Sequence, residues 1–145
     1  MADSFLDMQY EYEKEESMKL EESFPTITKT LYGYAPSAGS GNYLPDTIDE
    51  NYIVIPDTPK NRKADYIIEV GGDSMEPEYM DGERVLVKKQ DSVEIDEIGV
   101  FVINGDAYIK QFKSDRLHSL NPKRGDIYFE ENQTITCMGK VIGKL

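Results

Sequence analysis

The sequence predicts an all-β fold, built from compact twisted sheets or a partly open barrel, from about residue 49 to the C-terminus. Turn signals interrupt this region at short intervals, among them an Asp-Gly pair at 81–82 and an Asn-Gly pair at 104–105. An Asn-Gly pair between two apolar runs is typical of a tight β-hairpin. We find no convincing helical pattern in this region. Seven short runs rich in β-branched or aromatic residues are expected to form strands: 52–56, 65–70, 83–89, 98–103, 107–113, 126–131 and 134–145.

The chain before this β region has a different composition. Residues 1–34 include a glutamate-rich stretch, and we expect a flexible acidic linker or arm, because its apolar residues do not form a wide helical stripe. Residues 35–48 overlap the stretch "GYAPSAGSGNYLPDT", whose glycine, proline, serine and asparagine content predicts an exposed irregular loop. The expected organisation is therefore an arm, a loop and a folded domain over residues 49–145.

Composition limits the classes of function that the chain can have. Its 145 residues suit one domain, and 28 acidic against 16 basic residues give a formal net charge of −12. Phosphate backbones repel such a chain, which argues against nucleic-acid binding by the chain itself. There is no run of 18 apolar residues and no secretory signal pattern, so we expect a cytoplasmic protein that does not enter a membrane. A single cysteine, Cys137, excludes an internal disulfide, and one histidine argues against a zinc site; no cofactor or metal is expected.

The stretch "GGDSMEPEYMDG" at 71–82 follows a predicted strand and places Ser74 among glycines and acidic residues. Turn chemistry alone explains such a cluster well. A nucleophilic serine would also need a base, and the candidates are His118, Lys110, a carboxylate or a tyrosine. His118 and Lys110 each have an ordinary structural explanation, as a surface or half-buried histidine and as a lysine that projects from a strand into solvent. These residues alone leave the role of Ser74 open.

The order of several motifs resembles the LexA/CI-type self-cleaving repressor family, which is related to UmuD and similar in its catalytic fold to bacterial signal peptidases. The motifs are "GDSMEPEYMDGERVLV", then "AYIKQF" with a lysine 36 residues after the serine, then "HSLNPKRGDIYF". Upstream, "PSAGSG" contains an Ala-Gly bond, the type of bond at which such repressors cut themselves. The resemblance covers about residues 35–145. It implies a LexA-like β fold in which Ser74 is the nucleophile, Lys110 the base and Ala38–Gly39 the cleaved bond, within a cleavage-site loop over 35–48.

The chemistry of this pair sets a physical condition. Free lysine has a pKa of roughly 10.4, so Lys110 must be desolvated between apolar strands before it can act as a general base near neutral pH. We expect cleavage to accelerate as the pH rises from about 7 towards 10. The backbone N–H groups of Ser74 and Met75 are the expected oxyanion donors, because the preceding glycines permit a tight turn.

The resemblance implies a serine peptidase that acts on itself, within the C-terminal domain of a transcriptional repressor of the SOS response or of a prophage. It also implies stimulation by a RecA filament, homodimerisation, and DNA contact only through a helix-turn-helix domain that is absent from this chain. The alternative is a UmuD-like polymerase accessory protein that self-cleavage activates, although UmuD proteins typically use a Cys-Gly bond. A signal peptidase acting on other proteins is a third reading, against which the lack of a membrane anchor counts.

Overall fold

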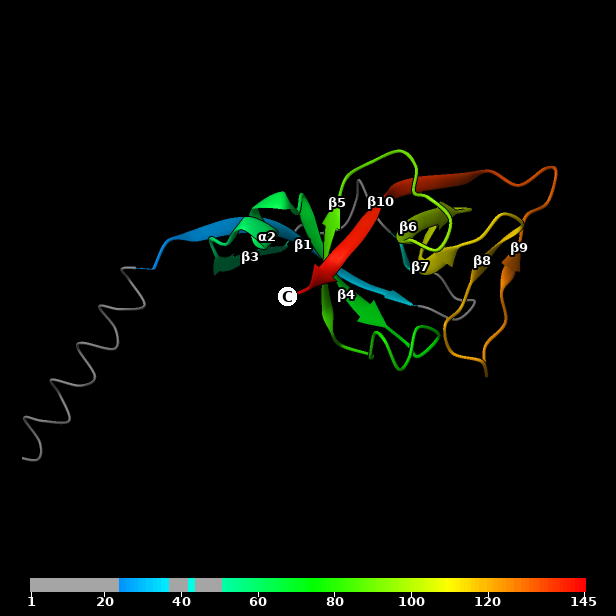
Figure 1. The fold of residues 1–145 in the computed structure, drawn as a ribbon, viewed down its shortest axis with the longest axis horizontal. Helices are drawn as coiled ribbons and strands as arrows, with labels where there is room; N and C mark the ends of the chain where they lie inside the picture. Colours follow the sequence, from blue (N-terminus) through cyan, green and yellow to red (C-terminus); the bar gives the residue numbers. More distant parts are fainter. Residues whose placement is uncertain (1–23, 37–41, 44–50) are drawn as a thin grey trace, which may run out of the picture.

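A computed structural model describes residues 24–36, 42–43 and 51–145 of the chain (Figure 1). Strands dominate this part of the molecule, and the helix found within it is a single short one. The elements are β1 (Thr26–Pro36), β2 (Asn42–Tyr43), β3 (Asn51–Pro56), α2 (Pro59–Lys63), β4 (Tyr66–Gly71), β5 (Arg84–Lys88), β6 (Ile98–Ile103), β7 (Asp106–Phe112), β8 (Arg116–His118), β9 (Ile127–Tyr128) and β10 (Ile135–Lys144).

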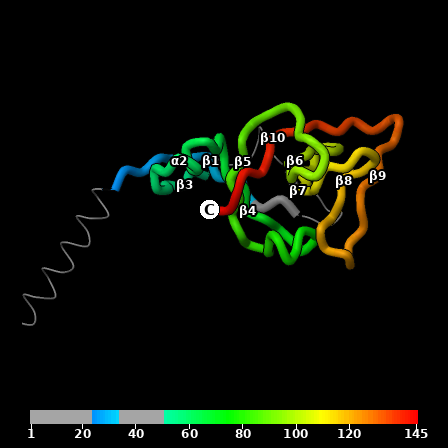
Figure 2. The backbone as a smooth tube through the Cα atoms, in the orientation of Figure 1, coloured from blue at the N-terminus to red at the C-terminus, as the bar shows by residue number. Residues whose placement is uncertain are grey.

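The strands form one mixed sheet in the order β3-β1-β4-β5-β10-β6-β7-β8-β9, with β2 added beside β7. Most neighbouring strands are antiparallel, whereas β1 and β4 run parallel. The long strand β10 crosses the middle of the molecule and pairs with β5 along one part and with β6 along another (Figure 2). The β1–β3 pair lies at one end of the molecule and β8–β9 at the other (Figure 1). The predicted all-β fold is thus confirmed.

The Asn-Gly hairpin between β6 and β7 forms as the sequence predicts. Asn104 has φ 53° and Gly105 has φ 84°, and two successive positive φ values are the mark of a type I′ turn. This turn fixes the register in which Val100 faces Ile109 and Gly99 faces Lys110. The turn therefore determines the position of Lys110 on β7, opposite Gly99 on β6.

The largest core cluster packs between strands that are far apart in sequence. Val70 at the end of β4, Met75 just after it, and Ala107 and Ile109 on β7 all belong to this cluster and are at most 1% exposed. The chain around residue 74 and the middle of β7 are therefore held by the same packed core. A second cluster includes Phe101 and other side chains of β6, β7 and β10.

The sequence did not predict β1, β2 or α2, and the seven expected strands did not include β8, although His118 was expected on a strand or beside one. β1 lies across residues that were assigned to an acidic arm and an irregular loop, yet it pairs with β3 on one side and β4 on the other. α2 begins at Pro59, and the side chain of Thr58 caps it by accepting the N–H of Asn61. The boundaries between arm, loop and folded domain stay a prediction. The helix in the described part of the chain is too short and polar to span a membrane.

Candidate active site

Ser74 lies in the turn that follows β4 and is completely buried. Gly72 begins this turn with φ 87°, and its N–H donates to the carboxylate of Asp81 at 2.7 Å. The next residue, Met75, is also 0% exposed and packs into the main core cluster. A positive φ at Gly72 reverses the chain just beyond the strand, and the buried Met75 then anchors it. The serine hydroxyl is consequently presented to the interior of the molecule.

The hydroxyl of Ser74 meets the side chain of Lys110, which comes from the middle of β7. Lys110 Nζ lies 2.7 Å from Ser74 Oγ and 2.9 Å from the hydroxyl oxygen of Ser119. Lys110 is 1% exposed, and it is among the largest fully buried side chains in the described part of the chain. The structure thus brings together two residues that the sequence singled out, across 36 positions of chain.

Burial lowers the pKa of Lys110 to about 8. The cause is desolvation, because taking an ammonium group out of water favours its neutral form. The negative charge of Asp126 acts in the opposite direction and raises the pKa of Lys110. A lysine with a pKa of about 8 is partly neutral at pH 7, whereas an ordinary lysine is almost entirely charged. Lys110 therefore loses its proton more readily than an ordinary lysine.

The loop over residues 119–126 holds the turn that contains Ser74 through hydrogen bonds. Asn121 donates its backbone N–H to the carbonyl of Ser74 at 2.8 Å and its side-chain amide to the carbonyl of Asp73 at 2.9 Å. Arg124 binds the Asp73 carboxylate through two nitrogens, at 2.7 and 2.9 Å. These hydrogen bonds from Arg124 lower the pKa of Asp73. The residue before Ser74 is thereby fixed through its main chain and its side chain.

Two stretches of described backbone pair with the strands that lead to these two residues. At the end of β1, Pro36 pairs with Gly71, three residues before Ser74. In β2, Asn42 pairs with Ala107 and Tyr43 with Asp106, at the start of the strand that carries Lys110. Residues 37–41 connect these two anchored points. The predicted cleavage site, Ala38–Gly39, falls in this connection and lies outside the described residues.

Comparison with known proteins places this chain in a family. A family model described as peptidase S24-like matches residues 30–142, a range that includes Ser74, Lys110 and the loop over 119–126. The chain belongs to the peptidase S24-like family. The resemblance to a LexA- or UmuD-type C-terminal peptidase domain, inferred above from ordered motifs, is thereby confirmed.

Several similar proteins are LexA repressors. One from Leptospira biflexa is 30% identical over 109 residues, which make up 74% of this chain and 54% of that protein. Another from Leptospira interrogans is 35% identical over 100 residues, which make up 65% of this chain and 48% of that protein. A third from Thermotoga petrophila is 31% identical over 100 residues, which make up 65% of this chain and 50% of that protein. The chain thus spans about half the length of the curated relatives it matches.

His118, which the sequence left open as an alternative base, has a different partner in this peptidase S24-like domain. Its Nδ1 lies 2.9 Å and 3.0 Å from the two carboxylate oxygens of Asp126. The guanidinium of Arg116 also pairs with Asp126, with Nε 3.0 Å from Oδ2. This arrangement matches the ordinary structural reading of His118 as a half-buried histidine, whose partner Asp126 lies in the loop after β8.

Ser119, Asn121 and Arg124 were not identified from the sequence as site residues. All three lie in the stretch "HSLNPKRGDIYF" that carried part of the family resemblance, so the motif gave a signal without a role for any of them. In the described part of the chain, no group of three or more His, Cys, Asp or Glu side chains is arranged to hold a metal ion.

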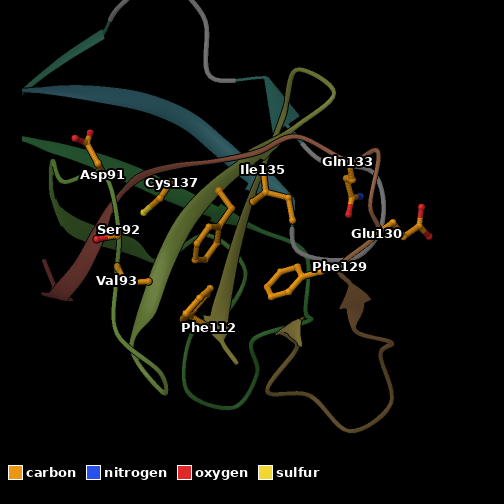
Figure 3. A pocket seen from close by; sticks show the side chains of 10 residues that line it. Asp91, Ser92, Val93, Phe112, Phe129, Glu130, Gln133, Ile135 and Cys137 are labelled. Atoms are coloured by element: carbon orange, nitrogen blue, oxygen red, sulfur yellow. The ribbon is translucent and has the colours of Figure 1, made fainter. Parts of the chain in front are cut away.

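A separate apolar pocket lies over the second core cluster (Figure 3). Three phenylalanine rings line it, and the ring of Phe112 packs between the other two. Its centroid lies 6.2 Å from that of Phe101 and 6.1 Å from that of Phe129. Cys137 lines the same pocket, and burial raises the pKa of its thiol. Because neither Ser74 nor Lys110 lines it, this pocket is distinct from the candidate active site.

Proposed function

We propose that this domain is a LexA-like self-cleaving serine peptidase that cuts its own Ala38–Gly39 bond, with Ser74 as nucleophile and Lys110 as general base. The observation that carries the proposal is the buried 2.7 Å contact between Lys110 Nζ and Ser74 Oγ, in a site where the pKa of the lysine falls to about 8. A buried lysine beside a serine is costly to maintain for structure alone, whereas a serine nucleophile requires such a base.

The proposed reaction begins with Lys110 in its neutral form. Nζ accepts the Ser74 hydroxyl proton while Oγ bonds to the carbonyl carbon of Ala38, and the backbone N–H groups of Ser74 and Met75 stabilise the oxyanion. The C–N bond then breaks, and the Lys110 ammonium returns the proton to the amine of Gly39. Neutral Lys110 next takes a proton from water, which attacks the Ser74 ester. The ester bond breaks, and the proton passes to Ser74.

The described residues on either side of the proposed substrate support its assignment. Pro36 pairs with Gly71, three residues before Ser74, and Asn42 pairs with Ala107, three residues before Lys110. We therefore infer that the loop over 35–48 supplies the substrate, between an N-terminal arm over 1–34 and the peptidase domain over 49–145.

The cellular role that we propose follows from the similarity to LexA repressors. In this proposal the domain belongs to a cytoplasmic transcriptional repressor, forms homodimers, and is stimulated by a RecA filament during the SOS response or prophage induction. Self-cleavage would then separate a helix-turn-helix DNA-binding part from the dimer contacts. The acidity of this chain fits a role in which another part of a longer protein contacts DNA.

The decisive experiment is mass spectrometry of the purified chain after alkaline incubation. We expect fragments 1–38 and 39–145 from the unaltered chain and none from Ser74→Ala or Lys110→Ala. Ser114→Ala and Lys88→Ala, which alter exposed residues, are the matched controls and should yield normal fragments. The cleavage rate of the unaltered chain should rise up to tenfold per pH unit below about 8 and level above it. Fragments from Ser74→Ala or Lys110→Ala, or a flat pH–rate profile, would contradict the proposal.

A further inference from the structure

Ser119 is a third polar side chain at the candidate site, and the reaction proposed above assigns it no role. It is 1% exposed, and its hydroxyl has two partners. The oxygen accepts from Lys110 Nζ at 2.9 Å, and the O–H donates to the carbonyl of Gly125 at 2.8 Å. A buried hydroxyl satisfied on both sides has a fixed orientation.

This orientation limits what Lys110 can do. A serine hydroxyl has one proton, and Ser119 gives it to Gly125, so only a lone pair of Ser119 faces the lysine. Lys110 must therefore donate an N–H to Ser119. A neutral amine has two N–H groups and one lone pair, arranged tetrahedrally about nitrogen. Once one N–H is committed to Ser119, the lone pair can point towards the hydroxyl of Ser74.

We infer that Ser119 is a positioning residue that acts through Lys110, holding the amine so that its lone pair faces the proton of Ser74. Ser119 neither gains nor loses a proton at any stage of the reaction. After Lys110 has taken the serine proton, the same oxygen of Ser119 stabilises the ammonium by accepting one of its three N–H groups. This inference rests on the proposed function, in which Ser74 and Lys110 carry the chemistry.

The backbone holds Ser119 in place independently of its hydroxyl. Ser119 follows β8 directly, and β8 is anchored to β7 by the pairing of His118 with Gln111, the residue next to Lys110. The N–H of Ser119 donates to Asp126 at 2.8 Å. Replacing the hydroxyl alone should therefore leave the main chain in position.

The charged surroundings of Lys110 are also defined. Asp126 raises the pKa of Lys110, and His118 and Arg116 both pair with the Asp126 carboxylate. Measurements of Ser119 variants belong above pH 7, in the range around the Lys110 pKa of about 8.

The test compares Ser119→Ala with Ser119→Thr. Loss of the hydroxyl removes one of the hydrogen bonds that orient the amine, so we expect the maximal cleavage rate of Ser119→Ala to fall by roughly 10²-fold, the scale of a small misplacement of a catalytic group. Ser119→Thr keeps a hydroxyl and should recover most of that loss. Ser114→Ala, which alters an exposed serine, should cleave at the normal rate. Circular dichroism establishes that each variant is folded.

A second measurement does not depend on cleavage. In a Ser74→Ala background, the pKa of Lys110 can be read from the ¹³Cε chemical shift of the lysine as the pH is raised. Because Ser119 accepts from the ammonium, Ser119→Ala should lower this pKa by roughly one unit. A change that merely loosened the fold would expose the amine to water and raise the pKa instead.

The possible outcomes separate this inference from the proposed function. If Ser74→Ala and Lys110→Ala abolish cleavage while Ser119→Ala cleaves normally with an unmoved lysine pKa, the inference fails and the proposed function stands. A raised lysine pKa in Ser119→Ala would likewise overturn the positioning role. If Ser74→Ala or Lys110→Ala still cleaves, the proposed function fails and takes the inference with it.

Discussion

At the scale of single residues, the buried amine of Lys110 determines the character of the site. An ammonium group in an apolar interior loses the solvation that water gives it, and the hydroxyls of Ser74 and Ser119 replace only part of that. The pKa of about 8 expresses the remaining penalty. The main core cluster, which contains the neighbouring Ile109, must supply the stability that offsets this penalty.

The stability of the domain should therefore depend on pH through Lys110. Its pKa is about 8 in the folded chain and near 10.5 when unfolded, so between these values the unfolded chain binds the additional proton and stability rises with pH. Below about 8, Lys110 is protonated in both states and contributes no pH dependence. The gain across the window is about 3 kcal/mol at ~1.36 kcal/mol per unit. Urea unfolding of Ser74→Ala and of Ser74→Ala with Lys110→Met, followed by circular dichroism, measures it.

The double variant serves as the reference, because other groups that titrate at alkaline pH are common to both chains. The stability difference should favour Lys110→Met most strongly below pH 8 and shrink between pH 8 and 10.5. Two stability curves that ran parallel across this window would show that Lys110 has an ordinary pKa.

The residues of the site differ in how far the sequence could reveal them. Ser74 and Lys110 were identified through the order of family motifs, because neither residue stands out by its local pattern. Ser119 was missed, since its hydroxyl matters only through contacts with Lys110 and the carbonyl of Gly125. Arg124 was missed for the same reason, as its partner Asp73 is 51 positions away.

At the scale of elements, local chemistry explains which strands were predictable. The β6–β7 hairpin was clear because the Asn-Gly pair specifies its turn. β1 was missed although Thr26, Thr28 and Thr30 alternate with larger side chains, because the acidic composition before it suggested an arm. β1 pairs with β3 and β4, and the local sequence of β1 does not indicate which strands it pairs with.

The central strand β10 offers a prediction at this scale. At Gly139 its register shifts beside β6, and an added Cβ would lie 2.6 Å from the carbonyl oxygen of Lys88 and 2.6 Å from a methyl group of Val87. Backbone cannot give way easily, so Gly139→Ala should lower the free energy of unfolding by about 1–3 kcal/mol. Thermal unfolding in a Ser74→Ala background measures the loss.

Gly143 on the same strand is the matched control. A Cβ there would meet the end of the Lys60 side chain, which is exposed and flexible enough to move aside. Gly143→Ala should therefore change stability by no more than about 0.5 kcal/mol. Equal losses in the two variants would mean that the close approach at Gly139 is not what requires glycine.

At the scale of the whole molecule, the sheet brings three distant parts of the chain to one place. The turn after β4 carries Ser74, β7 carries Lys110, and the described ends of the segment 37–41 are attached to these same two strands. Composition and strand patterns predicted an all-β domain but not this convergence, because strand order is decided by long-range pairing. Holding the proposed substrate and both reacting groups on one chain gives a high effective concentration.

Cleavage should consequently be intramolecular. We expect a first-order rate constant that does not change across a wide dilution series of the chain, followed by gel electrophoresis at fixed alkaline pH. Gly39→Asp keeps Ser74 and Lys110 but places a charged side chain at the proposed scissile bond, so it should remain folded and uncut. Mixed in excess with Ser74→Ala, it should leave that chain intact, because a second chain is present at a far lower concentration than the effective concentration of a tethered segment. A rate that rose with concentration, or cutting of Ser74→Ala in the mixture, would mean that the substrate comes from a second molecule.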